Sequence, residues 1–178
     1  MKTVFFDIDS QLDFLYPAGA LYVPRAERIV PAIARLNRYA AAHGIPLIST
    51  TDAHDENDVE FSQWPPHCIA GTLGQRKAEA TLVDAERQII VRKQTVDVFL
   101  CRELVSVVER LNPERAVVYG VVTEICVLSA ARGLLRMGKR VTVVTDAVEA
   151  LSVEGAERAL EEVRAGGGSW ATAGEICG

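Results

Sequence analysis

Short runs of β-branched and aromatic residues alternate with longer amphipathic segments along the whole chain. These runs predict strands at residues 3–8, 46–50, 88–92, 116–120, 140–144 and 169–172. Because most of them are continuously apolar rather than alternating in polarity, they are typical of a parallel sheet covered on both faces. The pattern predicts a three-layer α/β/α sandwich with a mostly parallel, Rossmann-like central sheet, formed by a single domain over residues 1–178.

The segments between the strands carry the apolar spacing of helices. We expect helices at residues 26–42, 102–111, 124–137 and 154–165. Pro31 lies early in the first of these, so that helix either kinks there or begins near it. Residues 52–81 interrupt the alternation of predicted strands and helices, because this stretch is long, polar and rich in Pro and Gly. Loops of that length in a compact domain are usually functional, so we expect this one to serve a metal or a substrate.

Composition narrows the classes of partner. The chain of 178 residues is 49% hydrophobic and 24% charged, as in a folded globular protein. Its 19 Lys and Arg against 24 Asp and Glu give a net charge of −5, which argues against nucleic acid. No apolar run approaches the roughly 18 residues of a membrane span. The four cysteines lie far apart and no secretion signal precedes the first strand, so we expect free thiols in a cytoplasmic protein.

Reactive side chains follow four of the predicted strands. Asp9 follows the first strand, Asp52 the second, Lys93 the third and Cys126 the fourth. Ligands of open α/β sheets bind beyond the carboxyl ends of the strands, so these residues are candidates for one site. Each alone has an ordinary alternative: Asp9 could cap a turn, and Lys93 could be a solvated lysine. Only their combination indicates a reactive centre.

Cys126 is the candidate nucleophile of this group. If Thr123 is the N-cap of the following helix, Cys126 occupies the third helical position, where backbone amides and the helix dipole stabilise a thiolate. The same amides could bind the oxyanion of an acyl-transfer intermediate. The alternative is a small buried cysteine that only packs the first helical turn.

Histidines in the long loop are the candidate metal ligands. Asp52 and His54 are two residues apart and share one face if the chain is extended, and His67 lies in the same loop. A carboxylate with two imidazoles suits zinc or iron(II), and Glu60 offers a fourth ligand. The alternative is a hydrogen-bonded His–Asp pair at the surface. His43, beside a helix-ending glycine, is expected to be a cap or a solvated residue.

Four segments resemble one family, the isochorismatase-like cysteine hydrolases. Residues 9–14 (DSQLDF) resemble the family's D-x-Q-x-D-F opening, and residues 120–126 (GVVTEIC) its G-x-x-T-x-x-C nucleophile turn. Residues 92–99 are similar to the catalytic-lysine segment, and residues 144–147 to the end of strand five. The resemblance runs from the first strand to the fifth. It implies that Asp9, Lys93 and Cys126 are the catalytic residues.

Residues 64–68 (WPPHC), together with Asp52 and His54, resemble the nicotinamidase branch of that family. This implies hydrolysis of the carboxamide of nicotinamide to nicotinic acid and ammonia, in pyridine-nucleotide salvage. It also implies a divalent metal, Zn²⁺ in first place with Fe²⁺ or Mn²⁺ as alternatives. The implied ligands are Asp52, His54 and His67, with Glu60 where many members carry another histidine.

The resemblance also assigns residues around the substrate. Phe14 and Trp64 correspond to the aromatic residues that flank the pyridine ring. The peptide bond between Val121 and Val122 is expected to be cis. The backbone amides of Val122 and Cys126 are expected to hold the oxyanion after Cys126 attacks the carboxamide.

Two other functions remain open from the sequence. One is another hydrolase of the same family, acting on a different small amide, carbamoyl or ureido substrate without a pyridine-binding metal. The other is a catalytically idle α/β module for subunit interaction, whose metal site is closed and purely structural. The sequence also leaves open whether the chain forms a homo-oligomer.

Overall fold

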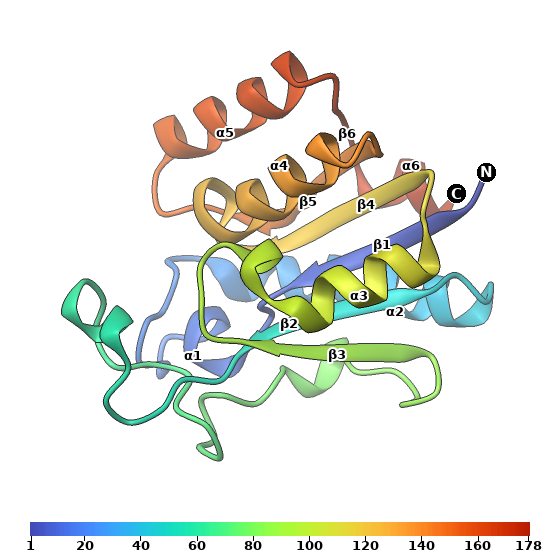
Figure 1. Ribbon diagram of the computed structural model, residues 1–178. Helices are drawn as coiled ribbons and strands as arrows, with labels where there is room; N and C mark the ends of the chain where they lie inside the picture. Colours follow the sequence, from blue (N-terminus) through green and yellow to red (C-terminus); the bar gives the residue numbers. More distant parts are fainter.

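The computed structural model describes residues 1–178, and its centre is a sheet of six parallel strands (Figure 1). The strands are β1 (Thr3–Ile8), β2 (Leu47–Asp52), β3 (Gln88–Lys93), β4 (Arg115–Val121), β5 (Arg140–Glu149) and β6 (Ser169–Ala171). Their order across the sheet is β3-β2-β1-β4-β5-β6, and every neighbouring pair is parallel. The predicted α/β class with a Rossmann-like sheet is confirmed.

Helices cover both faces of this sheet. They are α1 (Leu12–Leu15), α2 (Val30–Ala42), α3 (Arg102–Leu111), α4 (Leu128–Arg136), α5 (Val153–Ala165) and α6 (Ala173–Cys177). Helices α2 and α6 contact each other and the sheet on one face, whereas α4 and α5 pack together on the other (Figure 1). Pro31 occupies the first turn of α2, after a separate 3₁₀ turn at Ala26–Ile29, so the helix begins near the proline instead of kinking.

The site region is set by the order of the strands. From β1 the chain runs outward to β2 and β3, and β4 then returns to the other side of β1. The crossover connections therefore diverge between β1 and β4, which leaves a crevice at the carboxyl ends of these two strands. Gly120 makes this close pairing possible, because it lies opposite Ile8 with a φ of +119°.

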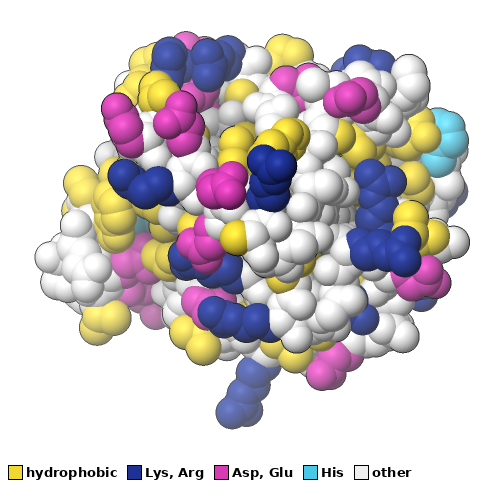
Figure 2. All heavy atoms as spheres, turned by 90° about the horizontal axis from the view of Figure 1, so that it is seen from above, with side chains coloured by type: hydrophobic (Ala, Val, Ile, Leu, Met, Phe, Trp, Pro, Cys, Tyr) yellow, Lys and Arg dark blue, Asp and Glu magenta, His cyan; other side chains and the backbone are white.

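The core is continuous around the central strands. Side chains of β1 and β4 are buried along nearly their whole length, whereas Ile90 on the edge strand β3 is 44% exposed. No helix combines the length and the apolarity needed to cross a membrane. On the face shown in Figure 2, basic and acidic side chains are interspersed.

The segment after β4 differs from the predicted helix at 124–137. The chain first forms a π-helical turn at Thr123–Val127, and α4 follows from Leu128. Val122, not Thr123, is the N-cap residue, and the buried Thr123 hydroxyl has no hydrogen-bond partner. The prediction of a Thr123 cap was wrong, because the wider turn already includes Thr123 and closes on the Val122 carbonyl (Val127 N to Val122 O, 3.1 Å).

Candidate active site

The carboxyl ends of four strands bring the predicted reactive residues together. Asp9 directly follows β1, Asp52 ends β2, Lys93 ends β3, and Cys126 lies in the turn after β4. All four are at most 8% exposed. Residues far apart in the sequence therefore share one buried centre at the switch point of the sheet.

The Lys93 ammonium contacts the other three residues of this centre. Its Nζ lies 2.8 Å from Asp9 Oδ2 and 3.8 Å from Cys126 Sγ, and it donates to Asp52 Oδ1. Burial by itself lowers the pKa of Lys93, but the carboxylates of Asp52 and Asp9 outweigh it and raise that pKa well above the ordinary value. The two carboxylates thus favour the charged form of Lys93, and its burial excludes the alternative of a solvated lysine.

The carboxylate of Asp9 is held from two sides. Thr50 Oγ1 donates to Asp9 Oδ1 over 2.6 Å, while Oδ2 faces Lys93. Asp9 has a φ of +49°, a left-handed conformation that non-glycine residues rarely adopt. The sequence analysis missed Thr50, although its position near the end of β2 placed it beside the other strand ends.

Burial opposes ionisation of the Cys126 thiol. It raises the pKa of this thiol well above the ordinary value; Lys93 lowers it, and Asp9 raises it further by charge and hydrogen bonding. Burial therefore opposes the thiolate that the sequence analysis expects, and the thiolate stays a prediction. A buried thiol next to a carboxylate needs that carboxylate as its proton acceptor.

A second cluster lies on the loop side of the same centre. One ligand atom from each of Asp52, His54 and His67 lies within 4.8 Å of the others, and all three residues are buried. His54 Nε2 is fully buried without a hydrogen-bond partner and lies 4.0 Å from Asp52 Oδ2. A buried, unpaired ring nitrogen among ligand atoms fits a metal site and not the alternative of a surface His–Asp pair.

Hydrogen bonds orient both imidazoles toward this cluster. His54 Nδ1 donates to Asp58 Oδ2 over 2.9 Å, and His67 Nδ1 donates to the Pro65 carbonyl over 2.8 Å. Each ring therefore presents the lone pair of Nε2 to the interior, the arrangement that metal-binding histidines adopt. Asp58 was missed by the sequence analysis, although its spacing of four residues from His54 was a usable signal.

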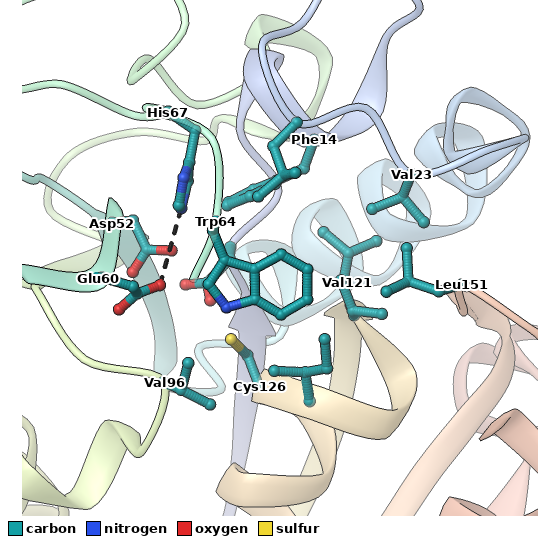
Figure 3. A pocket seen from close by; sticks show the side chains of 14 residues that line it. Phe14, Val23, Asp52, Glu60, Trp64, His67, Val96, Val121, Cys126 and Leu151 are labelled. Atoms are coloured by element: carbon teal, nitrogen blue, oxygen red, sulfur yellow. Dashed lines mark ion pairs between the residues drawn. The ribbon is translucent and has the colours of Figure 1, made fainter. Parts of the chain in front are cut away.

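Glu60 lies at the edge of the cluster. Its Oε1 is 3.9 Å from His67 Nε2, and its side chain is 17% exposed (Figure 3). Its carboxylate is not among the three converging ligand atoms. Glu60 is thus placed to reach the centre only with a small movement of its side chain.

Gln11, another residue of the predicted opening motif, fixes the backbone at Asp52. Its side-chain amide donates to the Asp52 carbonyl over 2.8 Å and accepts from the Asp52 N–H over 2.7 Å. The segment after β1 is thereby joined to the end of β2. These two bonds hold the main chain from which the Asp52 carboxylate reaches both Lys93 and the cluster of ligand atoms.

An apolar pocket of about 470 Å³, its open mouth included, leads to both clusters. Its nonpolar lining consists of Phe14, Leu21, Val23, Trp64, Val96, Val121, Val122, Ile125 and Leu151. In Figure 3 the polar side chains Asp52, Glu60 and His67 lie on one side and Val23, Val121 and Leu151 on the other. The peptide bond between Val121 and Val122 is cis, as the resemblance implied, and Val122 and Cys126 both line the pocket.

Fold and site together define an α/β enzyme with a buried cysteine, carboxylate and lysine at the switch point of a parallel sheet. The sequence matches the isochorismatase domain over residues 3–175, and the chain belongs to this family.

Several relatives of known structure or activity are similar over nearly the whole chain. A pyrazinamidase of Pyrococcus horikoshii, solved in complex with zinc, has a TM-score of 0.89 at 29% identity and covers 97% of this chain and 99% of that one. The nicotinamidase/pyrazinamidase of Mycobacterium tuberculosis is 25% identical over 172 residues, 88% of this chain and 91% of its own. An N-carbamoylsarcosine amidase of Thermoplasma acidophilum shares the fold, with a TM-score of 0.88 and 23% identity over 100% of both chains. The chain is an amidohydrolase, as predicted.

Proposed function

We propose that this chain hydrolyses nicotinamide to nicotinic acid and ammonia through a thioacyl intermediate on Cys126. The observation that supports this best is the single apolar pocket that reaches both Cys126 and the cluster of Asp52 and His67. One end of a flat aromatic amide can thus face the thiol while its ring faces the metal cluster. The two relatives named nicotinamidase or pyrazinamidase support the same substrate class.

Asp9 and Cys126 carry out the first step of the proposed reaction, the attack on the carboxamide. Asp9 takes the proton of the Cys126 thiol, and the sulfur attacks the carboxamide carbon. Lys93, 2.8 Å from Asp9 and 3.8 Å from the sulfur, stabilises the negative charge on either group. The backbone N–H groups of Val122 and Cys126 are proposed to hold the resulting oxyanion.

The same residues complete the turnover. The tetrahedral intermediate collapses, the C–N bond breaks, and Asp9 returns its proton to the leaving nitrogen, which departs as ammonia. Water then attacks the thioester carbonyl while Asp9 accepts a proton from that water. The C–S bond then breaks, the Cys126 sulfur takes the proton back from Asp9, and the product leaves as nicotinic acid, which releases its remaining proton to solvent.

Asp52, His54 and His67 are proposed to hold a divalent metal, zinc in first place, with Glu60 as a further ligand after a small side-chain movement. The unpaired Nε2 of His54 and the two oriented imidazoles fit such an ion. When bound, the ion would interact with the pyridine nitrogen and withdraw electron density from the ring, which makes the carboxamide more electrophilic.

Phe14 and Trp64 are proposed to flank the pyridine ring. Phe14 is buried in the pocket wall, and its ring centroid lies 5.4 Å from that of His67. Trp64 lines the same pocket from the long loop (Figure 3). Two aromatic faces separated by a pocket suit a planar heterocycle.

The charge of the pocket favours nicotinamide over an anionic carbamoyl or ureido acid. Its charged lining residues are Asp9, Asp52 and Glu60, and no lysine or arginine lines it. In the metal-free alternative, a substrate carboxylate would meet acidic groups there, and the nearby Lys93 ammonium is already paired with Asp9 and Asp52, which makes binding costly in a buried site. The likeness to the carbamoylsarcosine amidase at 23% identity is one of fold.

We further propose a place in NAD salvage within the cytoplasm. Nicotinic acid is a precursor that a salvage reaction can return to the pyridine-nucleotide pool. The four free cysteines fit the reducing compartment that this role requires.

Ammonia release from nicotinamide by zinc-loaded protein tests this function. We expect rapid release, and a loss of at least about 1,000-fold in kcat for Cys126→Ala, because no other thiol and no hydroxyl side chain lines the pocket. Zinc affinity should be unchanged in that variant. Cys177→Ala serves as a matched control and should keep full activity.

N-carbamoylsarcosine should be assayed in parallel as the competing substrate class. Hydrolysis of this acid without hydrolysis of nicotinamide would overturn the proposed substrate and retain the nucleophile. Steady-state hydrolysis of nicotinamide by Cys126→Ala would instead overturn the covalent mechanism.

A further inference from the structure

A second buried ion pair lies outside the active-site pocket. Lys77, near the end of the long loop, donates from Nζ to Asp7 Oδ2 near the carboxyl end of β1. The Asp7 side chain is fully buried, and that of Lys77 is 3% exposed. Neither side chain lines the pocket, and the proposed mechanism uses neither of them.

The hydrogen-bonding capacity of the Lys77 ammonium is fully used. Besides Asp7, it donates to Ser10 Oγ and, over 2.9 Å, to Thr81 Oγ1. An ammonium group has three donors, so each finds one acceptor. Burial lowers the pKa of Lys77 and the Asp7 carboxylate opposes that shift. The ammonium is thus tied to three separate positions of the chain.

Polar residues from two other elements complete the network around Asp7. Asn37 of α2 donates from Nδ2 to Asp7 Oδ2 over 2.7 Å, and Tyr119 of β4 donates from its hydroxyl to Asn37 Oδ1 over 2.7 Å. The acceptor of Lys77 is therefore itself held in place by the helix and the central strands. The bonds from Lys77 and Asn37 converge on Asp7 Oδ2, whereas the buried Asp7 Oδ1 has no hydrogen-bond partner.

The hydrogen bonds of Lys77 also reach the residue that directly follows Asp9. Ser10, which accepts from Lys77, is the next residue, and its carbonyl also accepts from Ala78 N over 2.9 Å. Leu12 N donates to Arg76 O over 2.9 Å, so residues 76–78 hold residues 10–12 by backbone bonds as well. Asp9 itself has the uncommon φ of +49°, which persists only where neighbouring contacts determine it.

We infer that Lys77 is a positioning residue for the reaction, acting through Ser10 on the orientation of the Asp9 carboxylate. It anchors the end of the long loop to β1 and fixes the residue that follows Asp9. The consequence for rate rests on the proposed function, whereas the effect on the reactivity of the Cys126 thiol does not.

The alternative is that Lys77 only neutralises the charge of Asp7. A buried ion pair can often be replaced as a whole by uncharged residues without loss of stability, whereas removal of one partner is destabilising. A double variant therefore separates the two roles. Asp7→Asn with Lys77→Met removes both charges but also the donor to Ser10.

The test compares Lys77→Met, the double variant Asp7→Asn/Lys77→Met, and Ser10→Ala, with Lys2→Met as the matched control at an exposed lysine. We expect kcat for nicotinamide to fall by about tenfold in the first three, with KM within about twofold, because a small misplacement of a catalytic group lowers rate steeply. The double variant should regain the melting temperature that Lys77→Met loses, but not the kcat. Ser10→Ala keeps the ion pair, so its melting temperature should stay near the wild-type value.

A second readout does not depend on the substrate. The rate of Cys126 alkylation by iodoacetamide at one fixed pH, followed by peptide mass spectrometry, should fall in the same three variants. Zinc affinity should not change in any of them. Wild-type kcat in either the double variant or Ser10→Ala would overturn the inference, as would equal alkylation rates in all proteins. If the wild type does not hydrolyse nicotinamide, kcat cannot be compared, and the Cys126 alkylation rates alone test whether Lys77 positions Asp9.

Discussion

Asp58 shows how one side chain outside the pocket can control a site within it. Its two oxygens serve two different parts of the loop: Oδ2 accepts from His54 Nδ1, and Oδ1 accepts from Glu60 N over 2.9 Å. The first contact fixes the ring of His54 with Nε2 toward the metal cluster. The second sets the backbone from which Glu60 approaches His67.

Asp58→Asn is expected to weaken zinc binding by about tenfold, since partners of metal-binding histidines typically contribute 10–100-fold in affinity. The amide can still accept a hydrogen bond but loses the charge that makes His54 a better ligand. Competition with a chromophoric chelator measures the affinity. Asp55→Asn, an exposed acid in the same loop, is the control; equal affinities in the two variants would show that Asp58 does not support the metal site.

The close pairing of β4 with β1 depends on one glycine, Gly120, which lies opposite Ile8. A Cβ at Gly120 would lie 2.0 Å from the Ile8 carbonyl oxygen, and the φ of +119° disfavours any side chain. Cys126 lies in the turn that follows β4, so the position of the strand sets the position of the nucleophile. The same contact determines how closely the ends of β1 and β4 meet.

Gly120→Ala is therefore expected to lower the free energy of unfolding by about 3 kcal/mol or more, because backbone must move in addition to the conformational cost. Gly138 is the matched control: its φ is +72°, and a Cβ added there would have nothing within 4 Å. Gly138→Ala should cost only about 1 kcal/mol. Urea unfolding of both variants measures the difference, and similar losses would contradict the proposed role of the close approach.

For the whole molecule, a metal would join the long loop to the sheet. Asp52 belongs to β2, whereas His54 and His67 belong to the loop, and the His54 side chain is fully buried. Binding to the folded state alone stabilises it by mass action. The loop, which contributes Glu60, Trp64 and His67 to the pocket, is thus expected to depend on metal for its order.

Zinc at 100 times its dissociation constant is expected to raise the free energy of unfolding by about 2.7 kcal/mol. For a chain of this size that corresponds to a rise of about 5–10 °C in Tm. Differential scanning fluorimetry with zinc and with EDTA measures the shift. It should disappear in His54→Ala and persist in His43→Ala, whose ring is exposed; persistence in both would place the zinc elsewhere.

Local sequence patterns were enough to predict the strands and helices and the reactive side chains at the strand ends. Periodicity is local, so strands such as Thr3–Ile8 and the helix Arg102–Leu111 could be placed within a residue or so. Because carboxyl ends of parallel strands share one edge, it also followed that Asp9, Lys93 and Cys126 could meet.

The contacts and the electrostatic environment of those residues could be seen only in the folded structure. The order of the strands, the pairing of Lys77 with Asp7 and the role of Thr50 depend on contacts across tens of residues, which no local pattern records. The upward shift in the pKa of Cys126 likewise comes from burial, which outweighs the nearby lysine. Packing sets the electrostatic environment of a side chain, and packing is a property of the whole fold.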